Sequence, residues 1–308
     1  NSTWDNDELA ARLEELHIEL PELEIEAMGF SIAEVDLLMD APPAEAALEE
    51  QPSIDPRLVP GVEPGDLWQL GRHRLLCASS LEIESFRRVM DGEQARLVFS
   101  DPPYNVPIAG FVGGLGSVKH AEFAMGCGEM SREQFVNFLQ TVFGHCAAMS
   151  IDGSVHYQCM DWRHMGEMLE AGHAAYSSLL NMCVWTKDNA GMGSFYRSQH
   201  ELVFVWKNGT APHLNTVKLG RDGRYRTNVW KFRGATKTGE NAEVRLHPTV
   251  KPVSMIMEAI RDASKRGEVV LDPFGGSGST LLAAHRTGRR ARLIEISPEY
   301  CEVIIRRW

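Results

Sequence analysis

The stretch EVVLDPFGGSGST, residues 268–280, decides the fold class of this 308-residue chain. Its apolar start, residues 268–271, is typical of a short buried strand, and the glycine loop that follows leads into a helix expected to reach Arg286. The next strand, expected over residues 291–296, carries the acid Glu295. A strand, a glycine loop, a helix and a strand ending in an acid together indicate a nucleotide-binding βαβ unit.

The chemistry of this loop narrows the class of ligand. Gly275, Gly276 and Gly278 allow a tight turn and a close approach of the backbone to a ligand. Glu295 follows Gly278 by 17 residues, at a position where a carboxylate can accept from both hydroxyls of a ribose. No Gly-Lys-Ser/Thr follows the loop, which disfavours a triphosphate, and the G-x-G-x-x-G pattern is absent, which disfavours a nicotinamide cofactor. A nucleoside without a phosphate chain remains, and S-adenosylmethionine fits that description.

A second stretch, Asp101-Pro102-Pro103-Tyr104, follows another short apolar run, residues 96–100. In an open α/β sheet, ligands bind beyond the carboxyl ends of strands, so this position favours a ligand site. Two prolines fix the backbone and remove two N–H donors, which leaves rigid carbonyls beside a carboxylate and an aromatic ring. These groups suit a flat ligand with an amine, such as a nucleobase flipped out of a duplex. An ordinary Asp-Pro turn is the alternative interpretation of the tetrapeptide alone.

The net charge of −11 is unevenly distributed. Residues 1–66 carry 18 acidic side chains against two basic ones, a net of −16, whereas the remaining residues hold 24 acidic and 29 basic side chains, a net of +5. Within the body, residues 207–251 contain ten basic and three acidic side chains, with aromatic residues between them. Basic side chains contact phosphate and aromatic rings stack on bases, so this stretch favours double-stranded DNA as the partner over an ordinary solvated loop.

We expect two parts, an acidic helical segment with a linker over residues 1–64 and a body over residues 65–308. Helices are expected in the front segment over residues 5–19 and 30–39, the second with Ser31 and Glu34 at capping-box spacing. The front segment has three possible roles: docking on the body, pairing with another subunit, or keeping non-specific DNA away.

The remaining elements of the body follow from hydrophobic periodicity and turn residues. Strands are expected over residues 67–70, 73–77, 153–159, 179–187 and 201–207, and helices over 85–90, 131–149 (capped by Ser131), 161–172, 252–265 (starting on Pro252) and from 298 onward. The glycine-rich stretch 105–130 is interpreted as a lid or, equally well, as a disordered loop.

Composition bounds the environment of the chain. Six cysteines, at positions 77, 127, 146, 159, 183 and 301, form no C-x-x-C pair and no Cys/His metal spacing, so free thiols, a reducing cytoplasm and no metal site are expected. No apolar run is long enough to span a membrane. The chain opens on Asn1, so a piece of a longer or processed product is expected.

Together the two stretches already described resemble the motifs of the amino-methylating DNA methyltransferases, and so does His247-Pro-Thr-Val-Lys-Pro252. The tetrapeptide precedes the glycine loop, an order similar to the β group of that family, with the target-recognition region between them, here residues 207–246. The front segment resembles the linker of phage-type proteins that join a ParB-like domain to such a methylase. The resemblance implies an α/β, Rossmann-like S-adenosylmethionine-dependent methyltransferase fold with a mixed, mostly parallel sheet and helices on both faces. It also implies a homodimer.

The resemblance assigns roles by position. The catalytic residues that would hold the flipped base are Asp101, Pro102, Pro103 and Tyr104. The cofactor-binding residues are Ser79, Asp101, Thr249, Lys251, Asp272, Phe274, Gly275, Gly276, Ser277, Gly278 and Glu295, with Thr249 and Lys251 near the methionine carboxylate and Glu295 on the ribose. The DNA-binding residues are Arg221, Arg224, Arg226, Lys231 and Arg233. One departure is Ser79, which replaces the acid that relatives use to contact the cofactor's adenine, so weaker cofactor binding is expected.

We expect N6-adenine methylation of duplex DNA by direct in-line transfer, because the tetrapeptide begins with Asp where Ser tends to accompany cytosine-N4 methylation. N4-cytosine methylation and a catalytically weak DNA-binding protein are the alternatives, and methylation of RNA or of a protein glutamine is a third. The sequence leaves open the recognition site and whether a restriction partner exists.

Overall fold

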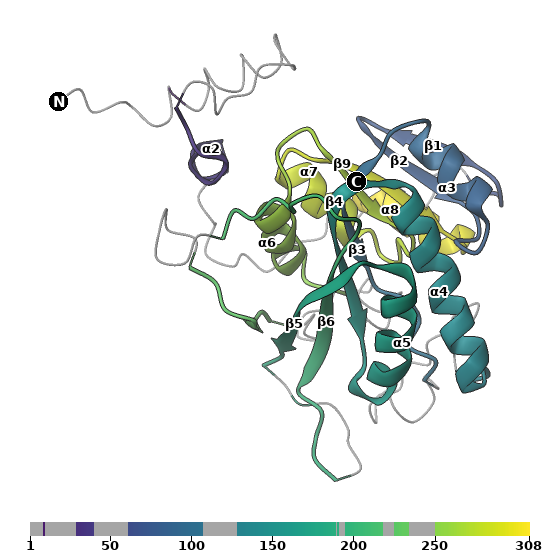
Figure 1. The fold of residues 1–308 in the computed structure, drawn as a ribbon. Coiled ribbons are helices and arrows are strands. Elements are labelled where there is room, and N and C mark those ends of the chain that lie inside the picture. The colour runs from purple at the N-terminus through teal and green to yellow at the C-terminus, as the bar shows by residue number, and fades with distance from the viewer. Residues whose placement is uncertain are drawn as a thin grey trace.

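The computed structural model describes residue 9 and residues 29–39, 61–106, 128–188, 190, 195–217, 225–233 and 250–308 (Figure 1). Its centre is a nine-stranded sheet with strand order β1-β2-β9-β8-β3-β4-β6-β5-β7. The strands are β1 (Leu67–Leu70), β2 (His73–Cys77), β3 (Ala95–Ser100), β4 (Ser150–Met160), β5 (Ser178–Thr186), β6 (His200–Lys207), β7 (Val229–Lys231), β8 (Val269–Asp272) and β9 (Arg290–Glu295).

Strand direction creates one functional edge. β2, β9, β8, β3 and β4 run parallel to one another, and β6 is antiparallel to both β4 and β5. β5 and β7 pair in parallel. The carboxyl ends of all these strands except β6 therefore lie along one edge, together with the amino end of β6. In open α/β sheets the edge formed by the carboxyl ends of the strands binds ligands, and we call it the functional edge.

Helices cover both faces of this mixed, mostly parallel sheet, as expected (Figure 1). One apolar core lies under α3 (Ile83–Met90), α4 (Arg132–Ala148) and α5 (Met165–Ala175), and a second lies under α6 (Val253–Ala263), α7 (Ser279–Arg286) and α8 (Pro298–Arg307). Successive residues of β3 alternate between the two cores: Leu97 and Phe99 enter one and Val98 the other. This alternation is the period-two geometry of a strand buried on both faces.

Local signals placed several elements correctly. Ser131 caps α4 through a capping box: its Oγ accepts from the Gln134 amide at 3.2 Å, and its own amide donates to the Gln134 side chain at 2.8 Å. Gly71, with φ of 57°, turns the predicted hairpin between β1 and β2.

Two predictions need correction. Pro252 is the extended N-cap of α6 rather than its first helical residue, and the helix expected over 161–172 divides into a short 3₁₀ helix, η3 (Trp162–His164), and α5.

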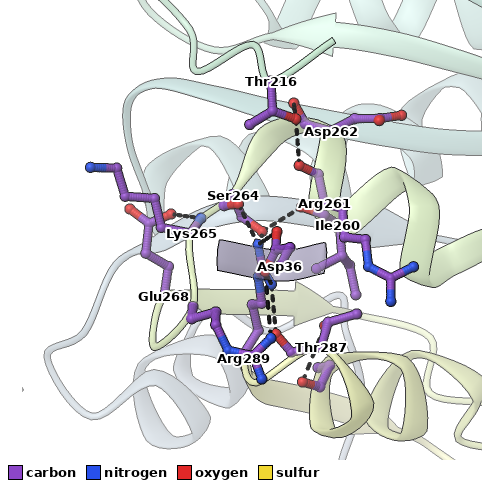
Figure 2. Close-up of polar contacts among 12 residues, drawn as sticks. Asp36, Thr216, Ile260, Arg261, Asp262, Ser264, Lys265, Glu268, Thr287 and Arg289 are labelled. Carbon is purple, nitrogen blue, oxygen red and sulfur yellow. Dashed lines mark hydrogen bonds and ion pairs between the residues drawn. The ribbon is translucent and has the colours of Figure 1, made fainter. Parts of the chain in front are cut away.

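The described part of the front segment, α2 (Ile32–Met39), docks on the body through a buried ion pair (Figure 2). Asp36, 2% exposed, accepts two hydrogen bonds from the Arg289 guanidinium, at 2.7 and 2.9 Å. Ser31 and Glu34 form the predicted capping box. Because Arg289 immediately precedes β9, α2 lies at the sheet edge opposite the functional one. The helix expected over residues 5–19, apart from Leu9, lies outside the described residues, and so do residues 40–60 of the front segment.

Candidate active site

Four adjacent strands deliver the predicted site residues to the functional edge. Asp101 directly follows β3, Asp272 ends β8, Glu295 ends β9, and Ser79 lies two residues beyond β2. These strands are neighbours in the order β2-β9-β8-β3, so residues up to 216 positions apart in the sequence meet at one edge. Thr249, Arg221 and Arg224 lie outside the described residues, as does the core of the glycine-rich stretch, residues 107–127.

The glycine loop is folded against the carboxylate of Glu295. The Gly276 amide donates to Glu295 Oε2 at 2.8 Å, and the Ser297 amide donates to Oε1 at 2.9 Å. Gly276 and Gly278 adopt φ values of 50° and 82°, which side chains rarely tolerate. A carboxylate has about four lone-pair sites, so Glu295 can still accept from a further donor. A buried acid with spare acceptor capacity beside a glycine loop fits the ribose of a nucleoside cofactor.

Other predicted cofactor residues hold the loop in shape. Burial raises the pKa of Asp272 to about 8, and its Oδ1 accepts from the Phe274 amide at 2.9 Å. The ring of Phe274 packs 5.9 Å from that of Phe138 on α4. Ser277 is buried and its carbonyl accepts from Arg307 at 2.5 Å, which ties the loop to α8. Ser79 Oγ accepts from the amide of Leu81 at 3.2 Å, so its hydroxyl already closes a local turn.

The tetrapeptide takes part in a cluster of charged side chains, of which Glu201 and Lys251 are buried and the others partly buried. Lys251 Nζ lies 2.6 Å from Asp101 Oδ2 and 3.0 Å from Glu201 Oε2. The hydroxyl of Tyr104 donates to Asp101 Oδ1 at 2.7 Å and lies 3.0 Å from Glu201 Oε2. Lys187 Nζ contacts the other Glu201 oxygen at 2.5 Å. We call these five side chains the acceptor cluster.

Burial and mutual charge set the protonation of this cluster. Burial raises the pKa of Asp101 above its ordinary value; Lys251 opposes this shift and Glu201 adds to it. Burial also raises the pKa of Glu201, but Lys251 and Lys187 outweigh it and lower the pKa to about 2. Burial lowers the pKa of Lys251, and the two carboxylates more than offset this. Glu201 and Lys251 are therefore charged at neutral pH.

The contacts of Lys251 differ from the expected ones. The resemblance placed Lys251 beside the cofactor carboxylate, whereas its described polar contacts are Asp101, Glu201 and the Tyr104 oxygen at 3.1 Å. An ammonium has three N–H donors, and these three acceptors can engage all of them. A contact between Lys251 and the cofactor stays a prediction.

Sequence reasoning missed Glu201, Lys187 and Asn105. Glu201 lies opposite Trp185 in the pairing of β5 with β6, and Lys187 directly follows β5, so only the strand pairing reveals their position. Asn105 adopts a positive φ of 51° and bonds the backbone of Gly128 and Met130, at 3.0 Å and 2.9 Å. It thereby joins the two described ends of the glycine-rich stretch. A polar residue just past the tetrapeptide was the only sequence signal.

The predicted DNA-binding residues separate into two groups. Arg226 faces inward: its guanidinium pairs with Glu258 and, at 3.0 Å, with Asp262 on α6. Its charge is paired within the protein, and a contact between Arg226 and DNA stays a prediction. Lys231 is exposed at the end of β7, beside the end of β5, and the Arg233 side chain is 77% exposed. These two cations lie at the functional edge.

An exposed aromatic pair was also missed. Phe195 and Tyr196, 86% and 81% exposed, follow β5 and precede β6, and their ring centroids lie 4.5 Å apart. The segment joining these strands is fixed at its base by the Lys187 amide, which donates to the Gln199 carbonyl at 2.9 Å.

Among the described residues no cluster of His, Cys, Asp or Glu could hold a metal ion, and no helix has the length and apolar character that a membrane crossing requires.

A family model described as DNA methylase, N6_N4_Mtase, matches residues 95–306. The chain belongs to the N6/N4 DNA methylase family. Type II methyltransferase M2.DpnII of Streptococcus pneumoniae is 28% identical over 237 residues, which cover 72% of this methylase and 85% of the relative. DNA adenine methyltransferase YhdJ of Escherichia coli is 25% identical over 248 residues, 70% and 76% of the two chains.

Solved structures share the fold. PvuII DNA methyltransferase, described as cytosine-N4-specific, superposes with a TM-score of 0.59 at 14% identity, covering 78% of this methylase and 87% of that chain. The M1.HpyAVI–SAM complex superposes with a TM-score of 0.54 at 16% identity, covering 76% and 98%. The methylase therefore has the S-adenosylmethionine-dependent methyltransferase fold, and as a member of the N6/N4 DNA methylase family it uses that cofactor. A link to a ParB-like domain stays a prediction.

Proposed function

We propose that the methylase transfers a methyl group to the N6 amine of adenine in duplex DNA. The observation that carries the proposal is the acceptor cluster, in which a half-buried carboxylate, Asp101, heads a rigid tetrapeptide one strand away from the glycine loop. A carboxylate at this point can accept an N–H bond from an exocyclic amine, and the Tyr104 ring can stack on the base.

The cofactor residues support a matching role. Gly275, Gly276 and Glu295 would hold the nucleoside, with Ser79 near its base and Ser277 near its methionine part. When bound, S-adenosylmethionine supplies a methyl group on a sulfonium, already activated toward a nucleophile. The protein must therefore mainly align the acceptor and stabilise the charge that forms on it.

Asp101 supplies that stabilisation in the proposed mechanism. The lone pair of an exocyclic amine is delocalised into the ring, so the nitrogen is a poor nucleophile. Asp101 and the Pro102 carbonyl each accept one N–H bond and draw the nitrogen toward tetrahedral geometry. Positive charge that develops on nitrogen is then stabilised by the carboxylate, which can also take the proton the amine loses. No covalent intermediate is required.

Cytosine N4 is the second candidate, because the family name covers both amines and PvuII DNA methyltransferase shares the fold. Asp rather than Ser at position 101 favours adenine. The deciding experiment incubates the protein with unmethylated duplex DNA and deuterated-methyl S-adenosylmethionine, then identifies the labelled nucleoside by mass spectrometry. Labelled N6-methyladenine is expected. Labelled N4-methylcytosine without N6-methyladenine would replace the proposal with the second candidate.

We further propose that the duplex lies along the functional edge, against Lys231, Arg233 and the Phe195–Tyr196 pair. Cations contact phosphates and exposed aromatic rings stack on unpaired bases, so this combination suits DNA from which one base has been removed from the stack. A homodimer stays a proposal that rests on the family resemblance.

A further inference from the structure

Glu201 is a buried acid to which the proposed reaction has so far given no task. It is 8% exposed at the amino end of β6, and its oxygens contact Lys187, Lys251 and the Tyr104 hydroxyl at 2.5, 3.0 and 3.0 Å. Lys251 also contacts Asp101 at 2.6 Å, so one ammonium lies between two carboxylates. Asp101 and Glu201 are 100 residues apart, and only the sheet brings them together.

The cluster is balanced in charge. Asp101 and Glu201 supply two negative charges, and Lys187 and Lys251 supply two positive ones. Removing the Glu201 charge would leave a net positive charge in a buried site. Buried charges interact strongly, and an unpaired one is costly. The net positive charge left in the cluster would also repel the positive charge that forms on the acceptor nitrogen during methyl transfer.

We infer that Glu201 is a positioning residue for methyl transfer, which shares Lys251 with Asp101 and so keeps the Asp101 carboxylate basic and directed toward the acceptor amine. The inference rests on the proposed role of Asp101. Without Glu201, Lys251 would pair with Asp101 alone and withdraw electron density from it. The single O–H of Tyr104 lies within reach of both carboxylates, and without the Glu201 charge it would donate to Asp101 alone.

The groups that face the two carboxylates fix the expected pH effect. They are Tyr104 after β3, Cys159 and Asp161 at the end of β4, Lys187 after β5, Lys251 before α6 and Asp272 at the end of β8. The charge of Glu201 raises the pKa of Asp101. Asp101 must be deprotonated to accept from the amine, so its pKa sets the pH below which the rate of methyl transfer falls. We call this part of the plot of rate against pH the acidic limb. Loss of the Glu201 charge should move that limb to lower pH.

The test compares Glu201→Gln, which keeps the shape of the side chain, with Glu201→Asp, which keeps its charge. We expect Glu201→Gln to slow single-turnover methyl transfer about 10- to 100-fold, because a small misplacement of a reacting group can cost up to about 100-fold in rate. Its acidic limb should shift to lower pH, while S-adenosylmethionine affinity, measured by calorimetry, stays within about twofold because the glycine loop lies on other strands. Glu201→Asp should keep the acidic limb of the unaltered protein.

A charge-balanced variant guards against simple misfolding. Glu201→Gln combined with Lys187→Gln removes one charge of each sign; the Lys187 side chain is 31% exposed, so we expect the fold to tolerate its replacement. We expect the double variant to return the acidic limb toward its original position, because one charge of each sign is removed, and to remain slower than the unaltered protein, because Lys251 still pairs with Asp101 alone. A double variant whose acidic limb stays where Glu201→Gln places it would overturn the inference, as would a single variant with unchanged rate and limb.

Failure of the proposed function would look different. If Asp101→Ala transferred methyl groups at a near-normal rate, the proposed role of Asp101 would fail whatever Glu201 did. If Asp101→Ala were inactive while Glu201→Gln behaved like the unaltered protein, only the inference about Glu201 would fail.

Discussion

The carboxylate of Asp101 accepts from Tyr104 and Lys251, and in the proposed reaction it must also accept from the acceptor amine. A carboxylate has about four lone-pair sites, so all three donors can be accommodated. Side chains from other strands decide how strongly Tyr104 and Lys251 bind this carboxylate. The ability of Asp101 to accept from the amine therefore depends on the whole acceptor cluster.

Replacing Asp101 separates cofactor binding from catalysis. We expect Asp101→Ala to lower methyl transfer by at least about 100-fold, because the acceptor for the amine is removed. S-adenosylmethionine binding should remain, since Glu295 and the glycine loop hold it. Transfer of tritiated methyl groups and calorimetry measure the two effects. Asp91→Asn, an exposed carboxylate that pairs with Arg74, is the control and should be active.

Asp272 makes stability depend on pH. Burial raises its pKa to about 8 in the folded protein, against about 3.9 in an unfolded chain. Between these values the folded state retains a proton that the unfolded state has released, so stability falls as pH rises through this window, by up to about 1.4 kcal/mol per pH unit. Asp272→Asn mimics the protonated acid and should flatten the fall. The urea concentration at half unfolding, measured between about pH 5 and 8 for both proteins, gives this change of stability with pH. An equally steep fall in the variant would contradict the raised pKa of Asp272 as its cause.

At the scale of elements, α2 and the segment between β5 and β6 lie at opposite edges of the sheet. α2 is held by Asp36, whose partner Arg289 also donates to the carbonyls of Ser264 and Thr287 at 2.6 Å (Figure 2). This network fixes the front segment without touching the functional edge. The Phe195–Tyr196 pair is exposed, and the segment that carries it is flanked by two members of the acceptor cluster, Lys187 just after β5 and Glu201 near the start of β6.

Undocking α2 should leave catalysis intact. Asp36→Ala removes hydrogen bonds between charged groups, worth about 1.5–3 kcal/mol, so amide exchange in residues 32–39 should become about 10- to 100-fold faster. Hydrogen-exchange mass spectrometry measures this change. Glu63→Ala, an exposed acid beside β1, is the control. Unaltered exchange in Asp36→Ala would show that the ion pair does not hold the helix.

The aromatic pair should matter for base flipping. Removing both rings with Phe195→Ala and Tyr196→Ala should lower duplex affinity, because stacking on a base is worth about 1–3 kcal/mol. This loss of affinity should be smaller on duplexes whose target base is mismatched, because less energy is required to take that base out of the stack. Fluorescence of 2-aminopurine at the target position reports flipping. Leu67→Ala, an exposed apolar residue on the far strand β1, should have no effect.

At the scale of the whole molecule, charge is segregated along the chain. The front residues are strongly acidic, while the body carries a net of +5 and exposes Lys231 and Arg233 at the functional edge. α2 places part of the acidic segment at the opposite edge, near Arg289 and Arg266. In the proposed orientation, DNA meets the basic side of the molecule beside the acceptor cluster.

Salt dependence tests this orientation. Lys231→Ala with Arg233→Ala should weaken binding to all duplex sequences alike and reduce the slope of log affinity against log salt by about 0.9 for each phosphate that the protein no longer neutralises. Fluorescence anisotropy at several salt concentrations gives the slope. Arg87→Ala, an exposed arginine on α3 paired with Glu84, should leave the slope unchanged. An unchanged slope in the double variant would place the DNA elsewhere.

The sequence alone determined the βαβ unit with its glycine loop, the strand before Asp101, the cap of α4 at Ser131 and the capping box of α2. These features depend on short-range physics: backbone freedom at glycine, side-chain capping and hydrophobic periodicity act within a few residues. They also sufficed to place Asp101, Asp272 and Glu295 at strand ends, and hence at one edge.

Only the tertiary structure decided the contents of the acceptor cluster. Lys251 is 150 residues from Asp101, and the order β3-β4-β6-β5 sets Glu201 and Lys187 beside them. The same long-range packing turns Arg226 inward to α6 and buries Asp36 against Arg289, 253 residues away. A charged residue looks alike in sequence whether it faces water or a buried partner, because strand pairing and burial determine its partner and its pKa.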